Sequence, residues 1–86
     1  MDKKIEFSQH ALLKIEILEN RGVTISTDLI SETIRTPSKV EASGEGKFIS
    51  QNRLNGLVLR VVYREYPDRI LVITAYPGRS SRYEKD

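Results

Sequence analysis

The strongest constraint on the fold is a change in hydrophobic period near Lys39. Before this residue, apolar side chains recur every three or four positions; after it, they alternate or form short apolar runs between turn signals. Three turns, Gly44-Glu45-Gly46, Asn55-Gly56 and Pro67-Asp68, divide the second half into predicted strands at residues 39–43, 47–53, 57–66 and 69–76. Asn-Gly suits the two positive-φ positions of a type I′ hairpin turn. The second half therefore predicts a four-stranded antiparallel meander.

Two helices are predicted ahead of these strands. Ser8 can cap a first helix over residues 7–21, with Gly22 just past its end, and Ser26 or Thr27 can cap a second helix over residues 26–36. Each helix gathers its core-facing side chains on one stripe: Ala11, Leu12, Ile15 and Leu18 on the first, and Leu29, Ile30, Thr33 and Ile34 on the second. A short strand at residues 4–7 is left open.

These elements define the expected architecture. A chain of 86 residues has room for one hydrophobic core, so we expect a single domain over residues 1–86. Its class is α+β, with two N-terminal helices packed on a four-stranded antiparallel β-meander at residues 39–76. The last two strands are apolar at nearly every position, which favours central places in the sheet. Pro77-Gly78 is expected to end the last strand and leave a basic tail at residues 77–86.

Composition excludes several kinds of chemistry. The chain has no cysteine and a single histidine, so it lacks a thiol nucleophile, a Cys-ligated metal site and any mechanism that needs two imidazoles. We therefore predict no metal and no cofactor. No apolar run approaches the roughly 20 residues that span a bilayer, and we expect a soluble, cytoplasmic protein with no membrane partner.

Positive charge gathers in the second half of the chain. The formal net charge is +2, but residues 46–83 carry seven bases against two acids. The bases are Lys47, Arg53, Arg60, Arg64, Arg69, Arg79 and Arg82. A guanidinium group suits bidentate contact with phosphate, so this asymmetry is compatible with a nucleic-acid partner. Arginine on the solvated face of a small sheet explains the same pattern without a ligand, and both interpretations stay open.

Three stretches of the chain carry a family resemblance. They are Phe7-Ser8-Gln9-His10-Ala11-Leu12, then Asn20-Arg21-Gly22-Val23, and finally Val72-Ile73-Thr74-Ala75-Tyr76-Pro77-Gly78-Arg79 with Arg82-Tyr83. The chain resembles, over roughly residues 5–83, a family of small, largely uncharacterised bacterial and archaeal domains of unknown function. Members open with a helical His-Ala-Leu motif, continue with Arg-Gly-Ile or Arg-Gly-Val, and close on a Thr-x-Tyr strand. This family is similar to the RelE/ParE-like toxins, BrnT among them, and to the wider barnase–EndoU–colicin–RelE ribonuclease fold.

The resemblance implies a toxin-like domain that cleaves RNA without a metal and is bound by a small cognate antitoxin. It implies the following catalytic residues: His10, Arg21, Arg60, Tyr76, Arg79 and Arg82. Expected RNA contacts are Lys14, Lys47, Arg53 and Tyr83, and the RNA could be mRNA on the ribosome. A ParE-like toxin without ribonuclease activity, or a non-catalytic protein-binding module, is the alternative. A homodimer through an exposed strand edge is also left open.

The chemistry of RNA cleavage can be compared with these residues. Attack by the 2′-hydroxyl needs a base, an acid and cations that stabilise the phosphorane. His10 is the best single acid or base at neutral pH, and helical spacing puts it on one face with Lys14 and Arg21. The second proton carrier would be Tyr76, Tyr83, a carboxylate or a lysine, because arginine does not release its proton.

Each candidate also has a structural explanation. His10 could pack against the sheet, Arg21 could interact with the helix dipole, and Tyr76 could be a core ring. Arg60 interrupts an apolar strand, and an unpaired buried charge is costly. It must therefore pair with an acid such as Glu32 or face an open groove.

Overall fold

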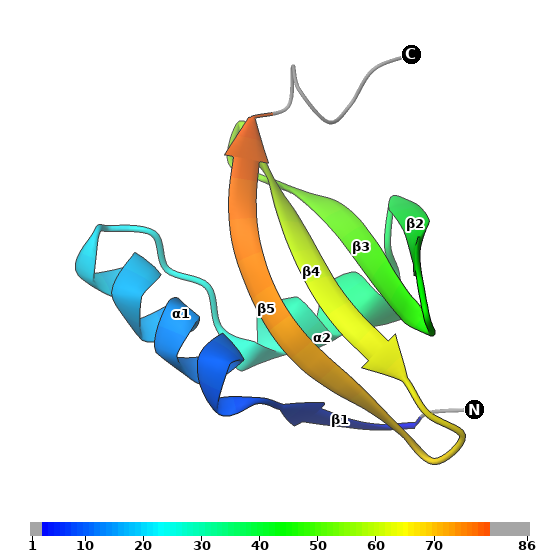
Figure 1. The fold of residues 1–86 in the computed structure, drawn as a ribbon. Coiled ribbons are helices and arrows are strands. Elements are labelled where there is room, and N and C mark those ends of the chain that lie inside the picture. Colours follow the sequence, from blue (N-terminus) through cyan, green and yellow to red (C-terminus); the bar gives the residue numbers. More distant parts are fainter. Residues whose placement is uncertain (1–2, 80–86) are drawn as a thin grey trace.

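A computed structural model describes residues 3–79 of the chain (Figure 1). The strands are β1 (Lys4–Phe7), β2 (Lys39–Gly44), β3 (Lys47–Leu54), β4 (Leu57–Glu65) and β5 (Arg69–Arg79). The helices are α1 (Gln9–Asn20) and α2 (Thr27–Arg35). The predicted α+β class and both predicted helices are confirmed, with Ser8 and Ser26 as the two N-caps.

The prediction of a four-stranded antiparallel meander is wrong in one respect, because the sheet has five strands and is mixed. Their order is β1-β5-β4-β3-β2; strands β2 to β5 form the antiparallel meander, and β1 joins β5 in parallel. Ion pairs help to hold β1 there, since Lys3 Nζ lies 2.7 Å from Glu65 Oε2 and Arg69 Nε lies 3.3 Å from Glu6 Oε1. A parallel pairing between the two ends of a chain leaves no local turn signal, so sequence pattern alone does not predict it.

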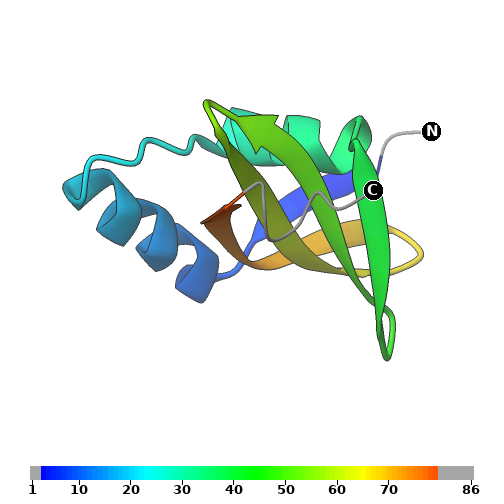
Figure 2. The same cartoon turned by 90° about the horizontal axis from the view of Figure 1, so that it is seen from above.

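Both helices pack on one face of the sheet. Helix α2 lies against β3 and β4, and α1 lies along β5 (Figure 1 and Figure 2). The core between the layers contains Ala11 and Leu18 from α1, Ile30 from α2, Leu59, Val61 and Tyr63 from β4, and Val72 and Ala75 from β5. Thus β4 and β5 occupy interior positions, as predicted.

The predicted stripe of α1 is wrong at Leu12, whose exposed fraction is 48%. Successive residues of a helix are about 100° apart, so Ile15 lies about 40° from Ala11 around the helix axis and Leu12 lies about 100° from it in the same direction. Helix α1 contacts the sheet mainly at β5, and only the narrower stripe of Ala11, Ile15 and Leu18 reaches the core. Leu13 and Ile17 are also exposed, at 53% and 38%.

Ser8 connects the start of α1 to an irregularity in β5. The pairing of β4 with β5 shifts between Val62 and Tyr63, where Ile73 is the extra residue on β5. The Ser8 hydroxyl donates to the Ile73 carbonyl at 3.0 Å and accepts from the Ala11 N–H at 3.0 Å. This bulge places both Val72 and Ala75 in the core although they are three residues apart. It also turns Tyr76 to the opposite face.

The three predicted turns are confirmed. Asn55 and Gly56 have φ values of 46° and 84°, as the type I′ turn requires, and Leu54 pairs directly with Leu57. The prediction that Pro77-Gly78 ends the last strand is wrong, because β5 runs to Arg79. Proline has no N–H, but β1 pairs with β5 only up to Val72, so at Pro77 no described strand borders the outer edge of β5. The rest of the predicted tail, residues 80–86, lies outside the described residues.

Candidate functional site

Strand β4 presents different chemistry on its two faces. Leu59, Val61 and Tyr63 point into the core, so Arg60 projects from the face opposite the helices. Hairpin pairing places Arg60 between Gln51 on β3 and Tyr76 on β5. This row of polar side chains crosses the centre of the sheet, and Arg60 is 5% exposed.

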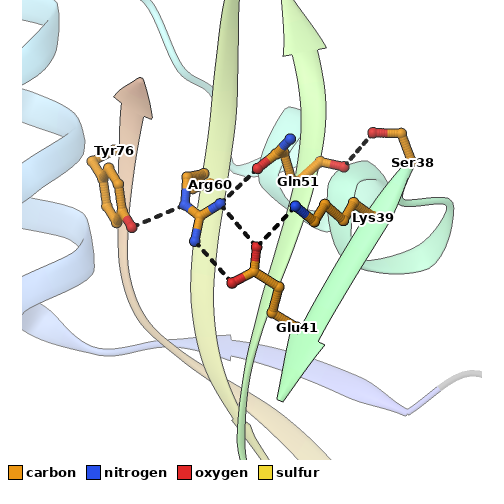
Figure 3. Close-up of polar contacts among 6 residues, drawn as sticks. All are labelled: Ser38, Lys39, Glu41, Gln51, Arg60 and Tyr76. Atoms are coloured by element: carbon orange, nitrogen blue, oxygen red, sulfur yellow. Dashed lines mark hydrogen bonds and ion pairs between the residues drawn. The ribbon is translucent and has the colours of Figure 1, made fainter. Parts of the chain in front are cut away.

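The guanidinium group of Arg60 is held from both neighbouring strands (Figure 3). Its Nε donates to the Tyr76 hydroxyl at 3.0 Å, and its Nη1 donates to Gln51 Oε1 at 2.6 Å. Both bonds come from residues in the same row as Arg60, so the planar group has one orientation. Its Nη1 and Nη2 atoms face toward β2.

A carboxylate from β2 completes the arrangement. The two oxygens of Glu41 lie 3.4 Å from Nη1 and from Nη2 of Arg60, and Lys39 Nζ lies 3.3 Å from Glu41 Oε2. A hydrogen bond attaches the residue before β2 to β3, because the Ser38 hydroxyl donates to the Gln51 carbonyl at 2.9 Å. We refer to Lys39, Glu41, Gln51, Arg60 and Tyr76 as the Arg60 cluster.

The ion pair affects the pKa of both groups. Hydrogen bonds from Arg60 and then from Lys39 lower the pKa of the Glu41 carboxyl below its ordinary value of 4.5. Burial disfavours the charged form of Arg60, but hydrogen bonds to Tyr76 and Glu41 outweigh that effect and raise the pKa of Arg60. At neutral pH the cluster therefore holds an ionised carboxylate against a permanent cation.

The structure brings together only some of the predicted site residues. Arg60 and Tyr76 are hydrogen-bonded to each other within the Arg60 cluster. His10, in the first turn of α1, and Arg21, at its C-cap, are exposed and have no side-chain hydrogen bond or ion pair with residues 3–79. Arg79 is exposed at the end of β5. Arg82 lies outside the described residues, as does Tyr83.

The three other predicted RNA contacts are spread over the molecule. Lys14 is half-buried in α1, Lys47 is half-buried at the start of β3, and Arg53 is exposed near the end of β3. Arg53 lies opposite Val58, so it shares the sheet face of Arg60. Lys47 pairs with Arg64, which gives that face a further pair of cations at its other end.

Sequence reasoning missed three members of the cluster: Lys39, Glu41 and Gln51. It foresaw that Arg60 needs an acid, but the partner is Glu41 and not Glu32. The signal was present in the turns, because pairing across Gly44-Glu45-Gly46 and Asn55-Gly56 aligns Lys39 with Gln51 and Gln51 with Arg60. Glu41, two residues from Lys39, then falls on the same face.

In the described part of the chain, no metal site coincides with the cluster, and one cavity lies apart from it. Within residues 3–79, no three His, Asp or Glu side chains gather closely enough to hold a metal ion. A cavity of about 320 Å³ lies between the loop after α1 and the β3–β4 hairpin, and its lining contains no charged side chain. It is lined by Gly22, Val23, Thr24, Leu54, Asn55 and Leu57.

Comparison with known proteins supplies the family. The family model of a domain of unknown function, DUF4258, matches residues 7–77, and the chain therefore belongs to this family. The predicted resemblance to an uncharacterised family of small domains is confirmed. No curated protein matches the chain, and no solved structure matches it. Neither helix in the described part of the chain is long and apolar enough to cross a membrane.

The Arg60 cluster contains the groups that a phosphoryl-transfer site without a metal needs. Glu41 is a carboxylate that can accept a proton, and Tyr76 is a hydroxyl that can donate one while it accepts from Arg60. Arg60 and Lys39 supply positive charge beside both groups. All of these atoms lie on one sheet face and derive from β2, β4 and β5 (Figure 3).

Proposed function

We propose that this chain is a toxin-like, RelE/ParE-like endoribonuclease that cleaves RNA at the Arg60 cluster without a metal ion. The observation that supports the proposal best is the pairing of a carboxylate and a phenol around one guanidinium, with Arg60 bonded to Glu41 and to Tyr76. A second cation, Lys39, also lies 3.3 Å from the Glu41 carboxylate, and acceptors for the Arg60 N–H groups do not account for it.

The proposed reaction is attack by a 2′-hydroxyl on the neighbouring phosphorus. The Glu41 carboxylate takes the 2′-hydroxyl proton, the 2′-oxygen bonds to phosphorus, and the bond from phosphorus to the 5′-oxygen breaks. The Tyr76 hydroxyl gives its proton to the departing 5′-oxygen, so the products are a 2′,3′-cyclic phosphate and a 5′-hydroxyl end. Arg60 and Lys39 stabilise the negative charge that develops on the phosphorane.

In this proposal, Arg53 and Lys47 contact phosphates of the RNA outside the cleavage site. Arg53 extends the cationic face of the sheet, and Lys47 begins the same strand at its opposite end. Guanidinium and ammonium groups that contact phosphates position RNA without reading its sequence. A role for His10 in proton transfer stays a prediction, because His10 is bonded to none of the cluster residues within the described part of the chain.

The test is cleavage of RNA in the presence of EDTA. Purified protein is incubated with total RNA and, separately, with translating ribosomes, and new 5′ ends are mapped. The wild type should cut at least one of these substrates. Glu41→Gln should lower the rate by about a hundredfold or more, since a general base contributes roughly 10²–10⁴-fold. The control is Glu45→Gln, which removes the same charge from the exposed β2–β3 turn and should cut normally.

Several outcomes of this assay count against the proposal. No cleavage of either substrate by the wild type contradicts endoribonuclease activity. Equal rates for the wild type and Glu41→Gln contradict the assignment of the base. His10→Ala belongs in the same series, because a hundredfold loss in that variant would transfer the proton-transfer role from the sheet to α1.

A second function, protein binding without catalysis, is favoured by the exposed side of α1. Leu12, Leu13 and Ile17 are 48%, 53% and 38% exposed. In this alternative, a small antitoxin-like partner covers these side chains. The two functions respond differently to salt: RNA binding by several cations weakens steeply as salt rises, whereas an apolar helix surface is nearly insensitive.

A further inference from the structure

Among residues 3–79, Gln51, Tyr76 and Glu41 hold the guanidinium group of Arg60 with unequal strength. Gln51 Oε1 lies 2.6 Å from Nη1 and the Tyr76 hydroxyl lies 3.0 Å from Nε. Glu41 carries the opposing charge, yet both of its oxygens lie at 3.4 Å. Charge-assisted bonds between guanidinium and carboxylate are usually about 2.7–2.9 Å long. The neutral partners thus orient Arg60, and the charged partner approaches only loosely.

Glu41 and Arg60 also differ in their access to solvent. The Arg60 side chain is 6% exposed, whereas the Glu41 side chain is 40% exposed. Glu41 projects from β2, the outermost strand on its side of the sheet. Its carboxylate can therefore move into water without crossing the protein interior, but the guanidinium of Arg60 stays in place.

The position of the Glu41 carboxylate has the geometry of an oxyanion site. Its two oxygens face Nη1 and Nη2, which is the arrangement in which arginine also binds two oxygens of a phosphate. Lys39 Nζ adds a second positive charge at 3.3 Å from one of these oxygens. A phosphate at this place would meet the same donors as the carboxylate.

We propose that the Nη1–Nη2 edge of Arg60, together with Lys39, is a phosphate-binding site that Glu41 occupies in the free protein and leaves when phosphate binds. The natural ligand, a phosphodiester of RNA, rests on the proposed function; the site itself does not. Departure of Glu41 from Arg60 also removes the main interaction that lowers the pKa of Glu41. The displaced carboxylate becomes a stronger base beside the bound phosphate.

Titration with inorganic phosphate at pH 7 tests this site without RNA. The readout is the NMR signal of the Arg60 Nε–H, compared among the wild type, Glu41→Gln and Glu45→Gln. Removal of the carboxylate that competes for Nη1 and Nη2 should lower the Kd for phosphate by about tenfold or more in Glu41→Gln. Glu45→Gln should match the wild type, because Glu45 lies in the exposed turn and contacts none of the cluster residues in the interactions described for residues 3–79. Glu41→Ala is the second variant if the glutamine variant does not fold.

The outcomes separate this inference from the proposed function. Phosphate affinity that stays equal or falls when Glu41 is replaced overturns the inference. The same holds if adding Lys39→Gln to the Glu41→Gln variant leaves phosphate affinity unchanged, because Lys39 is the second cation of the proposed site. If Glu41→Gln binds phosphate more tightly but the wild type cleaves no RNA, the phosphate-binding site is supported and the proposed endoribonuclease activity is rejected. If the protein cleaves RNA but Glu41→Gln binds phosphate no more tightly than the wild type, only the displacement of Glu41 is rejected, and the proposed function stands.

Discussion

Replacement of Ser8 by alanine tests how the N-terminus of α1 and the bulge of β5 depend on one hydroxyl group. In the native protein this hydroxyl accepts from the Ala11 N–H and donates to the Ile73 carbonyl, both at 3.0 Å. Loss of an N-cap costs about 1 kcal/mol. A carbonyl left without its donor in a partly buried place costs about 1 kcal/mol more. The free energy of unfolding should therefore fall by about 2 kcal/mol in total.

The matched control is Ser26→Ala. Ser26 caps α2 through one bond, with the Leu29 N–H at 3.0 Å, and its hydroxyl has no second role among the described contacts. Urea denaturation of both variants should give Ser8→Ala about twice the destabilisation of Ser26→Ala. Thermal unfolding should show a fall in Tm of roughly 10 °C for Ser8→Ala. Equal losses in the two variants would refute the argument that Ser8 supports the bulge.

Two further predictions concern the Arg60 cluster. The pKa of Glu41 is lowered in the folded state, so its ion pair stabilises the fold fully above the ordinary value of 4.5 and is lost as pH falls through the lowered value. Glu41→Gln should therefore show a weaker loss of stability below pH 4.5 than the wild type in acid unfolding followed by circular dichroism; parallel curves would contradict the pairing. Tyr76→Phe removes the acceptor of Arg60 Nε and should cost about 1 kcal/mol in urea denaturation. In the cleavage assay it should lower the rate by about a hundredfold, and full activity would exclude Tyr76 as the acid.

The local signals in the sequence predicted most of the fold. Asn55-Gly56 requires positive φ at both residues, so it determined the β3–β4 register and with it the position of Gln51 opposite Arg60. Ser8 and Gly22 bounded α1 correctly because caps depend on nearby backbone groups. Two of the five residues of the Arg60 cluster, Arg60 and Tyr76, are among the predicted site residues, and their side chains are hydrogen-bonded at 3.0 Å.

The parts that sequence pattern did not predict depend on distant contacts. The β1–β5 pairing joins residues more than sixty positions apart, and no turn connects them. The bulge at Ile73 breaks the two-residue period, and its partner Ser8 lies at the other end of the chain. Helical spacing alone assigned Leu12 to the apolar stripe, but α1 contacts the sheet mainly at β5 and leaves Leu12 exposed. Glu41 reaches Arg60 across β3, so this contact depends on the register of two successive hairpins.

The chemical nature of the cut ends tests the proposed endoribonuclease most directly. An RNA oligonucleotide with a mapped cleavage site is compared with the same oligonucleotide carrying a single 2′-deoxy nucleotide just before the scissile phosphate, both in EDTA. Attack by the 2′-hydroxyl at the Arg60 cluster predicts a 2′,3′-cyclic phosphate and a 5′-hydroxyl from the first, and an intact second oligonucleotide. Cleavage of the deoxy-substituted strand, or a 5′-phosphate on the product, would contradict this account.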